Sequence, residues 1–279
     1  MRLHLALVGA LAAPSLVGCA VSAPPDPGPE TTSPSSTPAT AVVEVDRTTG
    51  PGESARTDAV VARVVRVKQG AVDESALRIA GIPDELPAGG CIVPSEASAL
   101  NPGQSVELLN VGPVSMASDG ARNTLLMPRT MPDPAGVVSG FFYSARSADA
   151  FAAGSRVTFK TSGGTDLPDG FTISANAPKD LTAVRAVFGD DGALDVAWDA
   201  TEADPHDVVY ADVLSPAPHV VLRCVASDTG HLVVPASHLN SVDEGQLAVH
   251  RLHRESFRAK GIDPGEVRFD VAKVITFRR

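Results

Sequence analysis

Polar and apolar positions along this chain alternate in short runs that are typical of β-strands. The runs are rich in valine and end at glycine, proline or aspartate, so long helices are not expected. In the first part of the chain, strands are predicted at 59–67, 104–109, 136–143 and 156–161. In the second part they are predicted at 181–184, 194–198, 208–213, 220–225, 232–234, 246–252 and 267–277.

Two stretches fit more than one secondary structure. Residues 75–79 are compatible with a strand or with a short helical turn, and the pattern does not decide between them. Residues 244–260 would tolerate a helix. Gly245 and the alternation of Leu247 and Val249 with polar or small neighbours favour a strand there.

The second part of the chain has the pattern of a two-sheet sandwich. Seven runs separated by turn residues over about 100 residues are characteristic of such folds. Leu194, Val196 and Trp198 share one face of a strand, which makes the single tryptophan the expected core anchor. The arrangement, with Tyr210 on the following strand, resembles fibronectin type III and immunoglobulin-like domains.

The N-terminus has the pattern of an export signal. Residues 5–17 are almost wholly apolar but too few to span a bilayer permanently. The run ends in Leu-Val-Gly-Cys at 16–19, which resembles the lipobox of bacterial lipoproteins. The resemblance implies cleavage before Cys19 and lipidation of its thiol, and Ala20 implies the outer membrane. An ordinary secretory signal with an incidental cysteine is the alternative.

A change in composition follows the cysteine. Residues 20–40 contain six prolines among serines and threonines, which predicts a disordered, extended tether of about 60 Å. A domain boundary is predicted at Ala177 and Pro178. The expected organisation is a signal peptide at 1–18, the lipidated Cys19 and tether at 19–44, an N-terminal β-rich domain at 45–177 and a C-terminal sandwich at 178–279.

Composition excludes some partners. The formal net charge of −10 disfavours a nucleic acid. Basic residues gather near the C-terminus, but acidic residues lie between them, which indicates a solvated face. No Gly-rich phosphate loop is present, and an aromatic content of 4% argues against a sugar-stacking groove. No cofactor is predicted.

Two cysteines remain if Cys19 is lipidated. Cys91 and Cys224 would lie in an oxidising compartment, where disulfides persist. A bridge between them would tie the two predicted domains together. The alternative is that Cys224, on the same strand face as Leu222, is a buried free thiol that packs as a small apolar residue.

Catalytic and metal sites are not predicted. Six of the seven histidines fall between His206 and His253. On a strand, however, His250 and His253 would point to opposite faces. The acidic loop at 199–207 is a weak calcium candidate because its spacing does not match an EF-hand. The sequence has neither a strained serine elbow nor a cysteine–histidine pair, so no catalytic nucleophile is predicted.

A set of turn and core segments spreads over much of the chain after the tether, at 107–112, 151–155, 167–171, 177–178, 196–198, 223–224, 234–236 and 265–270. Together they resemble two-domain lipoproteins of myxobacteria-like bacteria. Because these motifs are turn and core residues, the resemblance implies a shape and no activity.

The sequence therefore predicts an all-β protein with two small sandwich-like domains. Its expected function is that of a non-catalytic cell-envelope lipoprotein that binds, adheres or scaffolds. Cys19 would hold it in the membrane, and an envelope protein or glycan is the expected partner. The alternative is a metal-dependent protein, enzymatic or not, that uses Zn²⁺ or Ca²⁺ in its His/Asp-rich C-terminal domain.

Overall fold

A computed structural model gives the fold. It describes residues 38–51, 56–67, 72–83, 85–87, 89–94, 105–120, 123–131, 137–147, 149–200, 204, 206–214, 220–239 and 244–279. All of them belong to one compact unit, Thr37–Arg279. Strands predominate, so the prediction of an all-β, sandwich-type fold is confirmed.

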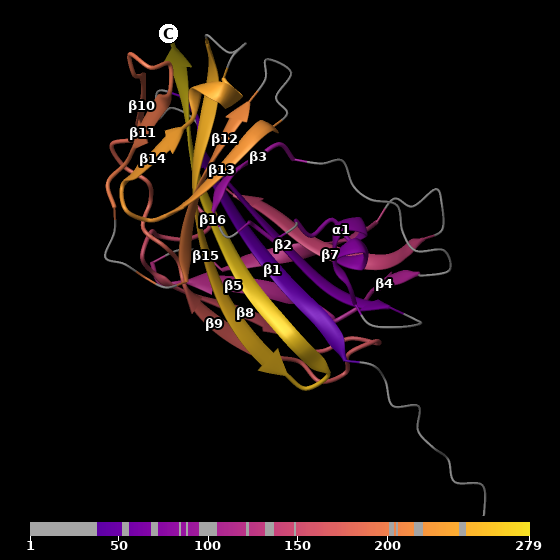
Figure 1. The fold of residues 1–279 in the computed structure, drawn as a ribbon. Coiled ribbons are helices and arrows are strands. Elements are labelled where there is room, and N and C mark those ends of the chain that lie inside the picture. Colours follow the sequence, from indigo (N-terminus) through magenta and orange to yellow (C-terminus); the bar gives the residue numbers. More distant parts are fainter. Residues whose placement is uncertain are drawn as a thin grey trace, which may run out of the picture. The chain divides into compact units, whose positions relative to one another are not determined.

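One long sheet organises the unit (Figure 1). Its thirteen strands follow the order β3 (Gly90–Ile92), β13 (Val220–Ser227), β12 (Asp207–Leu214), β15 (Glu244–Ala259), β16 (Ile262–Arg278), β1 (Ala39–Thr49), β2 (Arg56–Val67), β4 (Val106–Leu108), β7 (Val138–Ser147), β6 (Thr124–Thr130), β5 (Val114–Ser118), β8 (Arg156–Thr161) and β9 (Thr172–Asn176). A second sheet contains β10 (Arg185–Phe188), β11 (Leu194–Ala197) and β14 (His231–Val234). The described helices are α1 (Glu74–Ile79) and the short 3₁₀ helix η2 (Ala236–His238).

Strand β6 carries the long sheet from one layer to the next. Its first residues pair with β5 and its last residues pair with β7. The strands β5, β8 and β9 therefore lie across a core from β1, β2 and β16. This first core includes Phe151, Phe159 and Phe269.

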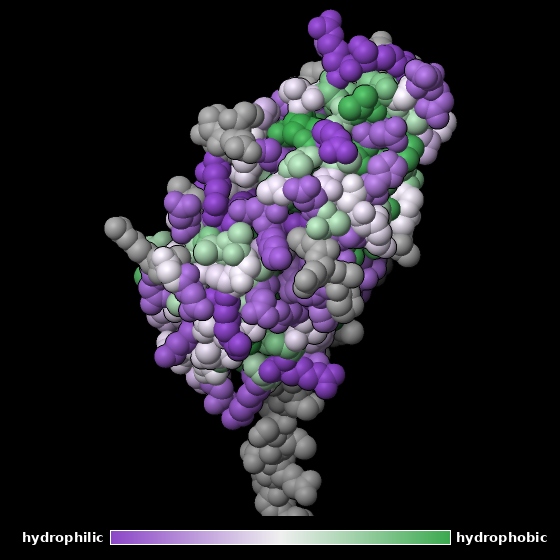
Figure 2. Space-filling view, turned by 90° about the vertical axis from the view of Figure 1, so that its left-hand side faces the viewer, coloured by the Kyte–Doolittle hydropathy of each residue, from purple (hydrophilic) through white to green (hydrophobic). Residues whose placement is uncertain are grey.

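The second core lies between β12, β13 and β15 of the long sheet and the small sheet. Trp198 is buried in it beside Leu194 and Val196, as the alternation predicts. The outer face of the small sheet exposes Val187 and Val233, and hydrophobic residues gather at the upper end of the view in Figure 2.

Strands β15 and β16 are shared by both cores. They contain 16 and 17 residues and pair along almost their whole length. Val267 and Phe269 of β16 pack in the first core, whereas Phe277 of the same strand packs in the second. The strand alternative for 244–260 is therefore confirmed.

The opposite face of the long sheet carries α1. Val42 and Val65 contact Ala76 and Ile82 there in a third, smaller core. Asp73 caps α1, because its side chain accepts a hydrogen bond from the backbone N–H of Ala76 at 2.8 Å. Residues 75–79 are thus helical, the second of the two alternatives.

The two main cores meet between Ala177 and Leu181. The first core includes Ala177, and the second begins at Leu181. Strand pairing nevertheless crosses this point, since β1 pairs with β16 and β3 pairs with β13. The two regions are joined by shared strands as well as by residues 178–180, which we call the connecting segment.

Two details of the predicted pattern are wrong. The tether was expected to reach residue 44, but β1 begins at Ala39, and the valines within 41–45 are buried. Residues 181–184 are not a strand, because Ala183 has a positive φ of 52° and the strand begins at Arg185. Leu181 is buried, which explains its apolar character without a strand.

Arg47 holds the end of the first core to the connecting segment. Its guanidinium donates from Nε and Nη2 to the two carboxylate oxygens of Asp58, at 2.9 Å each, and from Nη1 to Asp180, also at 2.9 Å. The Phe151 ring lies 3.6 Å from Cζ. The backbone N–H of Ala150 donates to Asp58, so the buried acid has two kinds of partner.

Arg251 of β15 binds the same segment from the other side. It is fully buried and donates from Nε to Asp228 at 2.8 Å. It also donates from Nη1 to the carbonyl oxygens of Lys179 and Asp180, at 2.9 and 3.3 Å. Asp228 accepts a further hydrogen bond from the indole N–H of Trp198. The connecting segment is therefore fixed to β1 and β15 by two buried arginines.

Replacing Arg47 by methionine tests the first of these contacts. The change removes the two hydrogen bonds from the cation to the buried Asp58 carboxylate and leaves only Arg56, at 3.6 Å, as a cationic partner, so the free energy of unfolding should fall by about 3–5 kcal/mol. Urea denaturation measures the loss. Arg185→Met, at an exposed position of β10, is the matched control. A loss no larger than that of the control would contradict the assignment.

Candidate functional site

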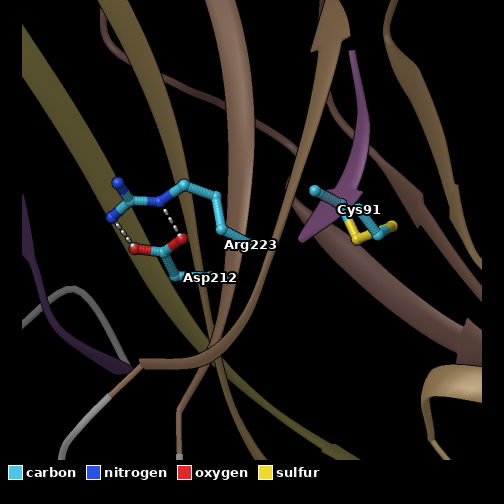
Figure 3. Close-up of a disulfide and its surroundings, with 4 residues drawn as sticks. Cys91, Asp212 and Arg223 are labelled. Carbon is cyan, nitrogen blue, oxygen red and sulfur yellow. Dashed lines mark hydrogen bonds and ion pairs between the residues drawn. A yellow bond between two sulfur atoms is a disulfide. The ribbon is translucent and has the colours of Figure 1, made fainter. Parts of the chain in front are cut away.

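Of the residues singled out in the sequence, Cys19 lies outside the described part of the chain. Its lipidation stays a prediction. Cys91 and Cys224 are described, and a disulfide joins them (Figure 3). They face each other in the antiparallel pairing of β3 with β13. The bridge attaches a strand of three residues to the edge of the long sheet.

Next to the bridge, β13 and β12 together contribute a charged pair to the other face of the sheet. Arg223 donates from Nε and Nη2 to both carboxylate oxygens of Asp212 on β12, at 2.7 Å each (Figure 3). Cys224 points into the second core and is fully buried, as its strand position predicts. The cysteines are engaged with each other, so neither is a free thiol.

The described histidines are distributed over separate parts of the fold. His231 and His238 are exposed on β14 and η2. His250 and His253 lie on opposite faces of β15, as expected for a strand. His253 alone meets two acids at ligand spacing, since its ring and the carboxylates of Asp204 and Asp207 have atoms within 4.8 Å of one another.

The His253 ring already has a partner at each nitrogen. Nδ1 lies 2.6 Å from Asp207 and Nε2 lies 3.2 Å from Glu255. Burial lowers the pKa of His253, but the hydrogen bonds to Asp207 and Glu255 outweigh it and raise the pKa above its ordinary value. Glu255 also accepts the backbone N–H of Asn176. The His253 ring thus joins β15 to β12, and through Glu255 the contact extends to the end of β9.

The pH dependence of stability reports the protonation of this ring. Because the pKa of His253 is raised in the folded state, its contribution is fully present below the unfolded value of about 6.5. The contribution is lost as the pH rises through the folded value. The difference in unfolding free energy between the wild type and His253→Gln should therefore be largest in acid and shrink above neutral pH.

Urea denaturation between pH 5 and pH 9, roughly the range over which histidine titrates, measures that difference. His238→Gln, at an exposed histidine of η2, is the matched control and should show no such trend. A difference for His253→Gln that stays constant over the whole range would contradict a raised pKa of His253 in the folded protein.

A second histidine belongs to a polar network on the opposite face of the sheet. His250 Nδ1 lies 2.9 Å from Asp270, and the Tyr210 hydroxyl donates to the same carboxylate. The rings of Tyr210 and His250 stack at 4.2 Å, and Arg223 lies over the Tyr210 ring at 4.7 Å. Asp212 links Arg223 to this group. Each of these charged residues has a partner, as buried charges require.

Asp46 borders this network. It pairs with Asp270 across β1 and β16. Loss of hydration is the main cause that raises the pKa of Asp46, and repulsion from Asp270 and Glu44 raises it further, to about 7. Asp46 nevertheless remains exposed to water. Asp46 holds its proton more tightly than an ordinary aspartate.

An apolar pocket lies where β6 passes between the layers. Its volume is about 380 Å³, and β6, β7 and the β4–β5 connection line it. Leu125, Met127 and Phe141 are 58%, 53% and 40% exposed at this pocket. The full lining is Asn110, Gly112, Pro113, Leu125, Leu126, Met127, Pro128, Phe141 and Tyr143.

Two glycines let the backbone form this pocket. Gly112 has a φ of +76°, and a Cβ there would lie 2.0 Å from the carbonyl oxygen of Gly163. Gly140, with a φ of +106°, packs equally closely against the carbonyl of Leu108, directly before Phe141. Both positions exclude a side chain, so the β4–β5 connection and the start of β7 hold fixed positions around the pocket.

The polar end of the pocket is formed by Asn110 and Tyr143. The Tyr143 hydroxyl accepts the backbone N–H of Val111 at 3.0 Å and donates to Oδ1 of Asn110 at 3.2 Å. The same Oδ1 accepts the backbone N–H of Gly112. Burial raises the pKa of Tyr143 above its ordinary value, so the hydroxyl remains protonated. Hydrogen bonds thus hold the Asn110 and Tyr143 side chains in place at this end of the pocket.

A second pocket, of about 430 Å³, lies between α1 and the start of β1. Its floor includes Val42 and Ile82, and its wall includes Arg268 and Glu266. Arg268 donates to Glu266 at 2.7 Å and to the carbonyl of Pro83 at 3.0 Å. Charged residues thus line this pocket, in contrast to the first.

The fold and the two pockets define an all-β, sandwich-type protein with ligand-sized sites. No protein-family model matches the chain, and no curated protein matches it. Among the described residues, no helix is both long enough and apolar enough to cross a membrane.

No local sequence pattern predicts the apolar pocket. Residues 125–128 (Leu-Leu-Met-Pro) and the consecutive aromatic residues 141–143 (Phe-Phe-Tyr) were the available signals. Pro128 interrupts the first run and hides strand β6. In the second run, the pattern does not show that Phe141 is exposed while Tyr143 is buried.

Proposed function

We propose that this protein is a non-catalytic binding module of the cell envelope, lipid-anchored through Cys19, that contacts its partner at the β6–β7 pocket. The observation that carries the proposal is the concentration of exposed apolar side chains there. Of the seven large hydrophobic residues exposed in the described part of the chain, Leu125, Met127 and Phe141 meet at this one pocket.

Exposed apolar side chains in a concave site favour association. Burying them removes apolar area from water, which stabilises a complex by roughly 25 cal/mol per Å² before the costs of binding. Concave sites with apolar walls and a few polar groups are typical of ligand sites. Met127 suits such a surface because its thioether adapts to different shapes.

The lining supports binding in preference to catalysis. Tyr143 is its one titratable residue, and its proton is held by burial. The histidines and acids of the described chain that form clusters lie elsewhere and pair with one another. Catalysis by acid and base would require such groups to face the bound molecule.

The proposed location rests on the N-terminal sequence. The apolar run, the Leu-Val-Gly-Cys motif and the proline-rich segment together support export and lipidation of Cys19. The outer membrane is proposed from Ala20. The envelope is also a compartment in which the Cys91–Cys224 disulfide persists.

A metal-dependent function is the second candidate, favoured by the spacing of Asp204, Asp207 and His253. We place it second because both nitrogens of His253 have acidic partners in the folded protein. Metal analysis of the purified protein tests it. Stoichiometric Zn²⁺ or Ca²⁺ that is lost in Asp204→Asn would reverse this order.

Site-specific photocrosslinking in the native envelope tests the binding function. Leu125 is replaced by benzoylphenylalanine, and adducts are identified by mass spectrometry as protein or glycan. A discrete adduct is expected, because Leu125 would lie in the contact. Benzoylphenylalanine in place of Val187 is the matched control. Val187 is 61% exposed on β10, and this variant should give no discrete adduct.

A Cys19→Ala variant tests the anchor in the same cells. Fatty-acid labelling should disappear, and the Leu125 adduct should weaken because the protein leaves its place in the envelope. Cys224→Ala should keep the label. Equal adducts at Leu125 and Val187 would contradict the pocket as the contact, and persistent labelling of Cys19→Ala would contradict the anchor.

A further inference from the structure

The β6–β7 pocket differs from the other described pocket in charge. None of its nine lining residues is an aspartate, glutamate, lysine, arginine or histidine. The pocket beside α1, by contrast, is lined by Asp73, Glu74, Glu85, Glu266 and Arg268. A charged group placed among Leu125, Met127 and Phe141 would lose its hydration without gaining an ionic partner. The lining therefore selects against charge.

The pocket lining also includes a hydrogen-bond donor, the side-chain amide of Asn110. Asn110 Oδ1 is occupied by the backbone N–H of Gly112 at 3.0 Å and by the Tyr143 hydroxyl at 3.2 Å. These two bonds fix the orientation of the amide. The NH₂ group of Asn110 makes no hydrogen bond to another described residue, so it remains able to donate to an acceptor on a bound molecule.

We propose that the pocket receives a short, uncharged, apolar peptide segment of a partner protein, with a backbone carbonyl accepting from Asn110. The inference rests on the proposed function and names the chemistry of its ligand. Peptide carbonyls supply the acceptor, and apolar side chains match Leu125, Met127 and Phe141. A glycan would bring many hydroxyls to walls that hold few polar groups, so it fits less well.

Two fluorescent probes with the same ring system test the selection against charge. N-phenylnaphthylamine is uncharged, and anilinonaphthalene sulfonate carries one negative charge. Both are titrated into residues 20–279, which retain the whole compact unit Thr37–Arg279. The uncharged probe should bind at one site, on the order of tenfold more tightly than the sulfonate.

Variants locate the site of the probe. Leu125→Ala combined with Met127→Ala should weaken binding of the uncharged probe several-fold, because two walls of the pocket are removed. Val187→Ala combined with Val233→Ala removes two exposed apolar side chains of the small sheet and should leave binding unchanged. Circular dichroism confirms that each variant is folded.

Capped dipeptides then test the peptide class by displacement. N-acetyl-leucyl-leucine amide should displace the uncharged probe, and N-acetyl-leucyl-glutamate amide should do so on the order of tenfold less well. Equal displacement by both dipeptides, or equal affinity for the two probes, would overturn the selection against charge. Failure of the leucyl-leucine dipeptide to displace a pocket-bound probe would overturn the peptide class.

These outcomes are distinguishable from failure of the proposed function. If neither probe binds, or if binding survives the Leu125 and Met127 changes, the pocket is not the contact site and both proposals fall. If the uncharged probe binds in the pocket but the peptide does not displace it, the binding function stands and its ligand belongs to another chemical class.

Discussion

The arrangement of this molecule depends on two buried arginines that hold the segment between its main cores. Arg47 reaches the Asp180 carboxylate from β1, and Arg251 reaches the backbone carbonyls of Lys179 and Asp180 from β15. Each arginine is neutralised by a buried acid, so neither charge is left without a partner in the interior. Hydrogen bonds of fixed direction thereby set the path of the chain where one core gives way to the next.

The shared strands couple the two cores, so the constraint at the connecting segment affects the whole unit. β15 and β16 pass from the first core to the second, and β3 returns to the second core through its disulfide with β13. A movement of one core would have to bend two paired strands and break the arginine contacts. The pocket at β6 and β7 is consequently held by the same sheet, which favours binding with little rearrangement.

Local pattern predicts the strands of this fold well where one face is buried and the other is solvated. Trp198, Cys224 and the alternation around Leu247 and Val249 show this clearly. The pattern fails where a strand is short or interrupted, as at Pro128 in β6. It also fails where burial does not require a strand, as at Leu181.

The candidate site could not be predicted from the sequence, because it is formed by contacts between residues that are far apart in the chain. Asn110, Leu125 and Phe141 meet because β4, β6 and β7 come together in the fold, which no local periodicity specifies. The same is true of His253, whose acidic partners could not be assigned from spacing alone. The resemblance of the second region to fibronectin type III domains stays a prediction, as does the lipidation of Cys19.

The central claim is that the two cores form one cooperative unit through β15, β16 and the buried arginines. Hydrogen-exchange mass spectrometry across a urea series tests it most directly, by comparing β5 and β8 of the first core with β11 and β13 of the second. The account predicts one unfolding midpoint for all four strands, because neither core can open while the shared strands remain paired. Separate midpoints for the two groups of strands would contradict it and would show two domains that unfold independently.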